Sequence, residues 1–447
     1  MSGIVPKCPT SVSYRQIWEL AWPAIITNIL FSSVGLAYVK IVSDEGAASI
    51  AAVTSGHRIF VLVQALLLGI SVATTALVAR SWGRSGPMQA ARWTWQSLYL
   101  GVAISLVTLL LGVVFARPIA SLFGLEGEAA DSLTLFLWVM LAFNPIYAVV
   151  VLLSSAFRAT GDARTPMRFS VLSCVLNIVL SLVLARGLLG FPAWGVVGVA
   201  LGGGIAPLLA FSLFGTRWWH NRYRFISGPR PAPSLRQSKH LMHIAMPATL
   251  EQVIIHGSMI IFMAYVAHYG TEAFAAFGLA ISLLAVIFVV GFGFSLAGSS
   301  IAGQCLGAGR PDLVRTVAWR SVVLSVAALA LLGLPSGIFA SSLSAMMVDD
   351  PAVAAYATPF IQILAALLPL IAIESSIGGV LRGIGDTRFP LMSTLAGIGL
   401  RLALGAGVVA LDWHVNYLFA TMVADYLLKV TLLSLRLLRY HAKAVSV

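Results

Sequence analysis

The sequence predicts an all-α membrane protein with twelve transmembrane helices in two pseudo-symmetric six-helix lobes. Three observations predict this fold class. Hydrophobic residues make up 59% of the 447 residues and charged residues only 10%, whereas soluble domains carry roughly 25% charged residues. Long apolar segments recur along the whole chain. The second half of the sequence also repeats the first half without a gap, which is typical of an internally duplicated fold.

The apolar segments are long enough to cross a bilayer, because a helix needs about 20 mostly apolar residues for this. The first segment follows a short polar stretch and is too long for the apolar region of a cleavable signal peptide. The predicted spans cover residues 17–42, 50–79, 93–116, 132–156, 167–187, 193–215, 240–266, 274–303, 317–341, 354–380, 389–410 and 414–437.

The repeat has a constant offset of 224 residues, as shown by Gly46 and Gly270. Six spans per repeat is an even number, so both halves enter the membrane with the same orientation and are related by an axis along the membrane normal. We predict an N-lobe over residues 1–216, a polar cytoplasmic linker over 217–239 and a C-lobe over 240–447. The same offset relates Pro23 to Pro247, Gly69 to Gly293, Arg158 to Arg382 and Asp162 to Asp386.

The net charge of +12 does not indicate a nucleic-acid partner, because the basic residues alternate with the apolar segments. With the N-terminus inside, 23 of the 28 Lys and Arg residues lie at cytoplasmic ends of the spans, including the last four from Lys429 onward. This bias predicts a multi-pass plasma-membrane protein with both termini in the cytoplasm. The three cysteines are scattered, so neither a disulfide framework nor a metal site is expected.

Two cytoplasmic loops have the composition of a helix–tight turn–helix hairpin. Arg158 and Arg382 lie near the end of a helix, where a cation complements the helix dipole. A glycine follows each arginine as a left-handed helix stop, and Asp162 and Asp386 are placed to cap the next helix. We expect these four residues to have a structural role.

The two loops read SSAFRATGDARTPM over 154–167 and GGVLRGIGDTRFPL over 378–391. Together with the matching openings WPAIITNIL and MPATLEQVI, they resemble the multidrug and toxic compound extrusion (MATE) family. The resemblance implies a V-shaped bundle with a central cavity that opens alternately to either side. It also implies a bacterial inner-membrane antiporter, expected as a monomer without a cofactor, which exports organic cations or amphipathic small molecules in exchange for inward H⁺ or Na⁺.

The chain departs from the family pattern in its N-lobe. Many bacterial members carry an aspartate in the first span and another in the fifth, where this sequence has Tyr38 and Ser181. The N-lobe therefore lacks the carboxylates that one branch of the family uses for proton coupling. Asn177 remains from that pattern.

Ionisable residues within the spans are the candidates for ion coupling, because burying a charge in hydrocarbon costs several kcal/mol and is rare without a function. Glu251 matches the coupling glutamate of the family, although it is also interpretable as structural glue. Glu374 lies one helical turn beyond the family's second acid. Asp425 and Arg401, the one deep cation, either form a structural ion pair or take part in coupling. These acids suit H⁺ or Na⁺, and their small number favours H⁺.

Neutral polar residues within the spans are candidates for lining a substrate cavity. Asn28 and Gln252 are repeat equivalents, which predicts that both face the pseudo-twofold axis. The complete set is Asn28, Gln252, Asn144, Asn177 and Tyr38.

Other functions remain open at this level. A flippase for lipid-linked precursors, or an exporter of citrate-like organic anions for which Arg401 would be the argument, has the same architecture. An intramembrane enzyme needs paired catalytic groups at one depth, such as a histidine-rich or two-aspartate metal set, and the sequence shows no such spacing. We therefore expect a transporter and not an enzyme.

Overall fold

The structure is a computed structural model that describes residues 11–122, 124–219 and 231–440. Regular structure in these ranges consists of fourteen α-helices and two short 3₁₀ helices. The all-α prediction is therefore confirmed. Part of the predicted linker, residues 220–230, lies outside the described residues, as does Cys8.

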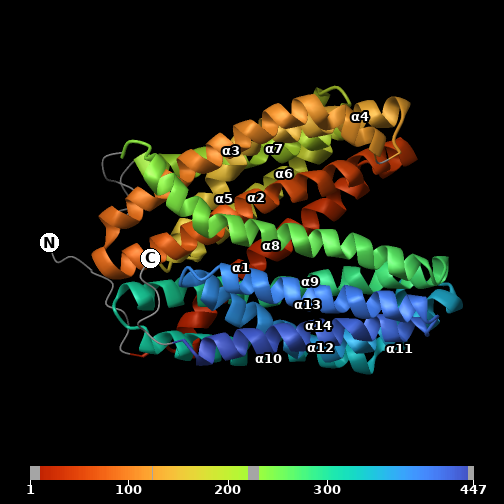
Figure 1. The fold of residues 1–447 in the computed structure, drawn as a ribbon. Helices are drawn as coiled ribbons and strands as arrows, with labels where there is room; N and C mark the ends of the chain where they lie inside the picture. The colour runs from red at the N-terminus through yellow and green to blue at the C-terminus, as the bar shows by residue number, and fades with distance from the viewer. Residues whose placement is uncertain (1–10, 123, 220–230, 441–447) are drawn as a thin grey trace. The chain divides into compact units, whose positions relative to one another are not determined.

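The first seven α-helices cover the N-terminal repeat (Figure 1). They are α1 (Tyr14–Ile41), α2 (Ala47–Ser85), α3 (Pro87–Leu122), α4 (Gly127–Ala142), α5 (Asn144–Ala159), α6 (Arg164–Arg186) and α7 (Gly195–Trp219), with the 3₁₀ helices Ser43–Glu45 and Leu188–Gly190 between them. The remaining helices are α8 (Leu235–Ala267), α9 (Thr271–Gly307), α10 (Asp312–Ile338), α11 (Ala340–Met347), α12 (Pro351–Gly383), α13 (Arg388–Ala410) and α14 (Val415–Leu438).

Eleven of these helices are long and apolar enough to cross a membrane, and the pair α4 and α5, which is bent by 49°, gives a twelfth span when the two are counted as one. The expected fourth span, 132–156, is thus interrupted at Phe143. Pro145 opens α5, at a position where the missing amide donor costs nothing. The ring of Phe143 packs where Gly204 has no side chain, since a Cβ there would overlap the ring.

The described residues divide into two compact units, which we call the first and the second unit. The first comprises the described residues of Ile26–Ala245, and the second comprises those of Met246–Val447 together with residues 11–25. The division falls next to Pro23 in α1 and Pro247 in α8. Both helices therefore begin in one unit and continue in the other.

Specific contacts account for this division. The Trp18 ring near the start of α1 lies 6.0 Å from the Phe294 ring, both in the second unit. The Gln96 side chain donates to Ser238 at 2.6 Å, near the start of α8, and both residues belong to the first unit. The start of α1 thus packs in the second unit, which holds most of the C-terminal repeat. The start of α8 packs in the first unit, which holds most of the N-terminal repeat.

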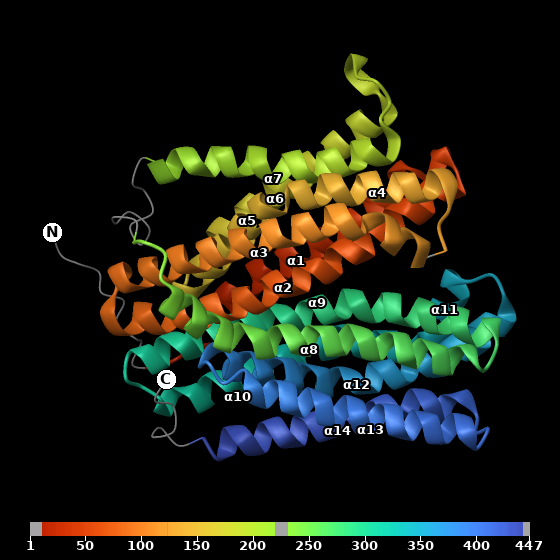
Figure 2. The same cartoon turned by 45° about the horizontal axis from the view of Figure 1, so that its top comes forward.

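The core of the second unit fixes the helices that carry its polar residues. Helix α12 packs against α9, α10 and α14, and α13 runs beside α14 (Figure 2). Their apolar contact includes a stack of Phe277, Phe360 and Phe419, with the last two ring centroids 4.0 Å apart. Aromatic pairs of this kind contribute roughly 0.5–1.5 kcal/mol beyond their buried area. The stack holds α9, α12 and α14 together beside the charged residues described next.

Candidate functional site

The second unit contains a group of buried ionisable side chains, which we call the charged cluster. Four helices, α8, α12, α13 and α14, contribute to it, and it holds three carboxylates and three cations. Its formal charge is therefore zero when every member is ionised. The members are Glu251, Glu374, Arg382, Arg401, Asp425 and Lys429.

Glu251 in α8 forms a two-point ion pair with Arg382 in the last turn of α12. Arg382 Nη2 lies 2.8 Å from Glu251 Oε1, and its Nε donates to Oε2 at 3.2 Å. Thr394 in α13 donates to Oε1 at 3.0 Å. Glu251 is only 1% exposed. A buried carboxylate is tolerated when it is paired and hydrogen-bonded in this way.

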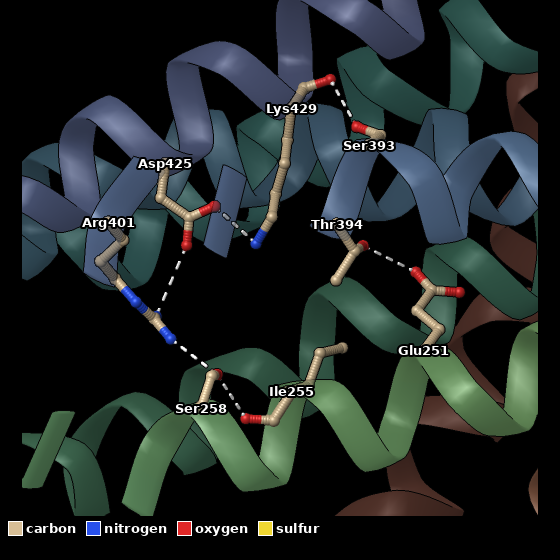
Figure 3. A network of polar contacts seen from close by, with 8 residues as sticks. All are labelled: Glu251, Ile255, Ser258, Ser393, Thr394, Arg401, Asp425 and Lys429. Carbon is tan, nitrogen blue, oxygen red and sulfur yellow. Dashed lines mark hydrogen bonds and ion pairs between the residues drawn. The ribbon is translucent and has the colours of Figure 1, made fainter. Parts of the chain in front are cut away.

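Asp425 in α14 lies between two cations (Figure 3). Lys429, one helical turn later, places Nζ 2.7 Å from Oδ1, and Arg401 in α13 places Nη1 3.5 Å from Oδ2. Arg401 is held by a second contact, because its Nη2 donates to Ser258 at 2.8 Å. Neither Asp425 oxygen has a hydrogen bond of good geometry within the described chain. These ion pairs are therefore close in distance but poorly directed.

Small and aromatic residues shape the space around Asp425. The Arg401 guanidinium lies 5.3 Å from the centroid of the Phe262 ring, and Lys429 Nζ lies 5.0 Å from that of Tyr426. Such cation–π contacts are stabilising when the cation is desolvated. Gly397 in α13 faces the pair, because a Cβ there would overlap Asp425 Oδ1 and crowd the Lys429 stem.

Glu374 in α12 differs from the other two acids. Within the part of the chain that the structure describes, it forms no ion pair and no hydrogen bond. Both Arg382 and Lys429 nevertheless act on it electrostatically, as do the carboxylates of Glu251 and Asp425. Glu374 is thus an additional buried acid within electrostatic range of the cations of both pairs.

The structure brings together the four residues expected to serve ion coupling, Glu251, Glu374, Asp425 and Arg401, and adds two that sequence reasoning missed. The expectation that Arg401 is the one deep cation is wrong. Lys429 is only 6% exposed, although it was counted among the cytoplasmic charges. Arg382 was assigned to the loop hairpin, yet its side chain turns back to Glu251.

One signal for Lys429 was present in the sequence. Its spacing of four residues from Asp425 places both side chains on one helix face. No local signal pairs Arg382 with Glu251, which lies 131 residues away.

The polar residues of the first unit form neutral contacts. Tyr38, which is 1% exposed, donates to Asn177 at 3.0 Å, and Ser181 donates to the same oxygen at 3.1 Å. Asn144 is also 1% exposed and donates to Thr108 at 3.1 Å. The structure therefore places Tyr38 and Asn144 inside helix packing. Asn28 and Gln252 are half-buried, and their cavity role stays a prediction.

The two hairpins share one backbone geometry. Gly161 and Gly385 have φ values of 97° and 93°, a region that favours glycine. Asp162 accepts the amide of Thr165 at 3.0 Å at the start of α6. Asp386 accepts the amide of Phe389 at 3.3 Å and also the Arg436 Nε at 2.9 Å.

Arg158 and Arg382 occupy equivalent positions in the last turns of α5 and α12. Arg158 donates to Ser155 at 3.0 Å, and no ion pair is seen for it among the described residues. Its partners therefore differ from those of Arg382, which is paired with a buried carboxylate.

Comparison with known proteins agrees with the duplicated fold. The MatE family model matches the chain twice, over residues 23–183 and 247–406. The probable multidrug resistance protein NorM of Thermotoga maritima is 25% identical over 438 residues, which cover 96% of this chain and 93% of that protein. A protein named FAD transporter from Shewanella oneidensis is 24% identical over 351 residues, or 78% of each chain.

Solved structures share the fold. A crystal structure of a MATE protein in complex with MaL6 has a TM-score of 0.88 at 20% identity, over 98% of this chain and 99% of the other. A MOP superfamily transporter from Pyrococcus furiosus has a TM-score of 0.86 at 19% identity, over 96% and 97% of the two chains. With twelve spans, a doubled family match and relatives of nearly equal length, the chain belongs to the MATE family of multi-pass membrane transporters, which are not enzymes.

Proposed function

We propose that this protein is a secondary active efflux transporter that exchanges organic cations or amphipathic drugs for inward protons by alternating access. It acts as a monomer in the bacterial inner membrane with both termini in the cytoplasm. One observation carries the proposal: Glu251 is a fully buried carboxylate, 2.8 Å from the Arg382 guanidinium. The NorM relative in Thermotoga maritima supports multidrug efflux as the transported class.

Protonation of Glu251 would change the energy of the site in a defined way. The ionised carboxylate is held by Arg382 and Thr394. A proton removes its charge and leaves Arg382 without its hydrogen-bonded carboxylate partner, and a buried charge that loses its partner is costly. The protonated site therefore favours a conformation in which Arg382 finds another partner or solvent. A ligand shifts such an equilibrium only through its different affinity for the two states.

The pairing also favours H⁺ over Na⁺. A metal ion at Glu251 would have to find space beside the Arg382 guanidinium, whose positive charge repels it and which contacts both carboxylate oxygens. A proton needs no such space. Export of an anion is less well supported, since Arg382 and Arg401 are already engaged by carboxylates. The FAD transporter from Shewanella oneidensis nevertheless makes FAD a useful second cargo to test.

The test uses purified protein in liposomes loaded with an ethidium-type dye. Dye movement is followed first under an imposed pH gradient, then under a Na⁺ gradient, and FAD replaces the dye in a parallel series. We expect dye efflux with the pH gradient alone. Glu251→Gln, which keeps the shape but cannot release a proton, should abolish it.

Glu272→Gln is the matched control, because Glu272 is an exposed acid in the first turn of α9. This variant should transport like the wild type. Normal pH-driven efflux by Glu251→Gln would refute the coupling role of Glu251. Wild-type movement of FAD without any dye movement would refute the proposed cargo class.

A further inference from the structure

We infer that Lys429 is a built-in cation that excludes metal ions from the charged cluster and so makes it selective for protons. The inference rests on the proposed function, which it deepens by naming a residue that determines the coupling ion. Lys429 lies four residues after Asp425 in α14, and its Nζ sits 2.7 Å from Asp425 Oδ1. This is the position in which a small cation would contact the carboxylate.

Burial strengthens the ion pair between Asp425 and Lys429 and so its ability to exclude another cation. Asp425 is completely buried, and Lys429 is nearly so. Inside the protein, two charges interact far more strongly than in water, and salt screens them little. A dissolved cation would have to lose its hydration shell and also compete with an ammonium tethered to the same helix. The tethered group is favoured because it pays no translational entropy.

The charge balance of the cluster leads to the same conclusion. Its three carboxylates, Glu251, Glu374 and Asp425, are balanced by three side-chain cations, so an added Na⁺ would leave an excess positive charge. A proton also adds charge, but it binds covalently to one oxygen and needs no coordination space. Removing the Lys429 charge would leave one net negative charge, which Na⁺ could neutralise.

The surroundings of Lys429 hold it against Asp425. The Gly397 backbone packs directly on Asp425 Oδ1 and the Lys429 stem, where a Cβ would overlap both. Lys429 also acts electrostatically on Glu374, which has no ion pair of its own in the described chain. Without the ammonium, the Asp425 carboxylate would be left to bind a desolvated cation, and the charge of Glu374 would act on that cation electrostatically. Oxygen-rich sites between transmembrane helices are those that bind Na⁺ in transporters.

The test compares wild type, Lys429→Met and Lys429→Arg. Methionine keeps an unbranched stem of similar length without the charge, and arginine keeps the charge. Thermal unfolding of each purified protein is measured in NaCl and in choline chloride at equal ionic strength. We expect Lys429→Met to melt several degrees higher in NaCl, because a bound ion stabilises the folded state. Wild type and Lys429→Arg should show no difference between the salts.

The same proteins are then assayed in liposomes. Lys429→Met should gain a Na⁺-driven dye flux at least about fivefold above that of the wild type. This factor is the lower end of the range by which ligand binding at one site typically changes affinity at another. The double variant Asp425→Asn/Lys429→Met has lost the carboxylate as well and should show neither the Na⁺ stabilisation nor the flux.

The outcomes separate this inference from the proposed function. If the wild type shows no dye efflux under the pH gradient, the proposed function is refuted. The melting experiment still tests whether Lys429 excludes Na⁺ from the charged cluster. A folded Lys429→Met that is indifferent to Na⁺ in both assays refutes the role of Lys429. A Lys429→Met variant that does not fold in NaCl or in choline chloride also counts against the role of Lys429, because bound Na⁺ should replace the missing charge and allow folding in NaCl.

Discussion

In the first unit, Tyr38 and Asn177 are joined by a neutral hydrogen bond of 3.0 Å. At the equivalent positions of the second unit, 224 residues later, Phe262 and Arg401 are joined by a cation–π contact of 5.3 Å. The two repeats thus use the same pair of facing positions with different chemistry. The backbone arrangement came with the duplication, whereas the charge belongs to one repeat only.

The same contrast holds at other positions of the charged cluster, with the exception of Arg382, which corresponds to Arg158. Glu251 corresponds to Thr27, and the pair Asp425 and Lys429 corresponds to Leu201 and Ile205. A neutral network loses about 0.5–1.5 kcal/mol when one hydrogen bond is removed. A buried ionic network loses several kcal/mol when one charge is left alone. The second unit therefore carries buried carboxylates at Glu251 and Asp425, whereas the corresponding positions of the first unit hold uncharged side chains.

The largest effect should come from the two equivalent arginines. Arg382→Met leaves the Glu251 carboxylate buried without its cation and should destabilise the protein by about 3–5 kcal/mol. Arg158→Met removes only the hydrogen bond to Ser155, a loss of about 1 kcal/mol. Thermal unfolding in detergent compares the two variants. Equal shifts of the midpoint would mean that the ionic character of the second unit does not matter for its stability.

A smaller effect should come from the glycine that makes room for Asp425. Gly397→Ala forces a Cβ into the Asp425 carboxylate and should cost about 1–3 kcal/mol, as overpacking does. Gly399→Ala, two residues along the same helix, meets nothing within 4 Å and serves as the control. Unfolding midpoints are again the measurement. A Gly397→Ala variant as stable as Gly399→Ala would show that the ion pair tolerates displacement.

The smallest effect should come from the neutral network. Tyr38→Phe gives the first unit the residue type found at Phe262 and removes one hydrogen bond to Asn177. The loss should be about 0.5–1.5 kcal/mol, because Asn177 still accepts the Ser181 hydroxyl. Proton-driven dye efflux should continue. Loss of efflux in this variant, with normal stability, would place coupling in the first unit as well.

The fold could be predicted from the sequence because the bilayer dictates the length of each span and the repeat dictates the symmetry. Apolar length alone locates the spans, and the differences are local. The fourth span breaks at Phe143, where Pro145 opens a new helix, the short helix α11 follows the ninth span, and α8 begins at Leu235, within the predicted linker. The burial cost of a charge is equally readable from sequence, and it pointed to Glu251, Asp425 and Arg401.

The partners of these charges could not be read in the same way. Arg382 and Lys429 lie toward the ends of apolar segments, where a basic residue normally reaches the aqueous interface. Only helix packing shows that both side chains point inward. Which helices pack together depends on how well the surfaces of α8, α12, α13 and α14 fit one another. The spacing of residues within a single helix does not predict this fit.

Because α1 and α8 each extend over both units, fragments that contain one repeat each lose contacts. A fragment that ends before α8 would present Gln96 without the Ser238 hydroxyl it donates to. The complementary fragment would lack the Trp18 indole that lies against Phe294. Two half-length polypeptides that are made separately should therefore be unstable and prone to aggregation, whereas their synthesis in the same cell should restore function. Each unit thus includes the start of a helix from the other repeat, so the two repeats are not autonomous modules.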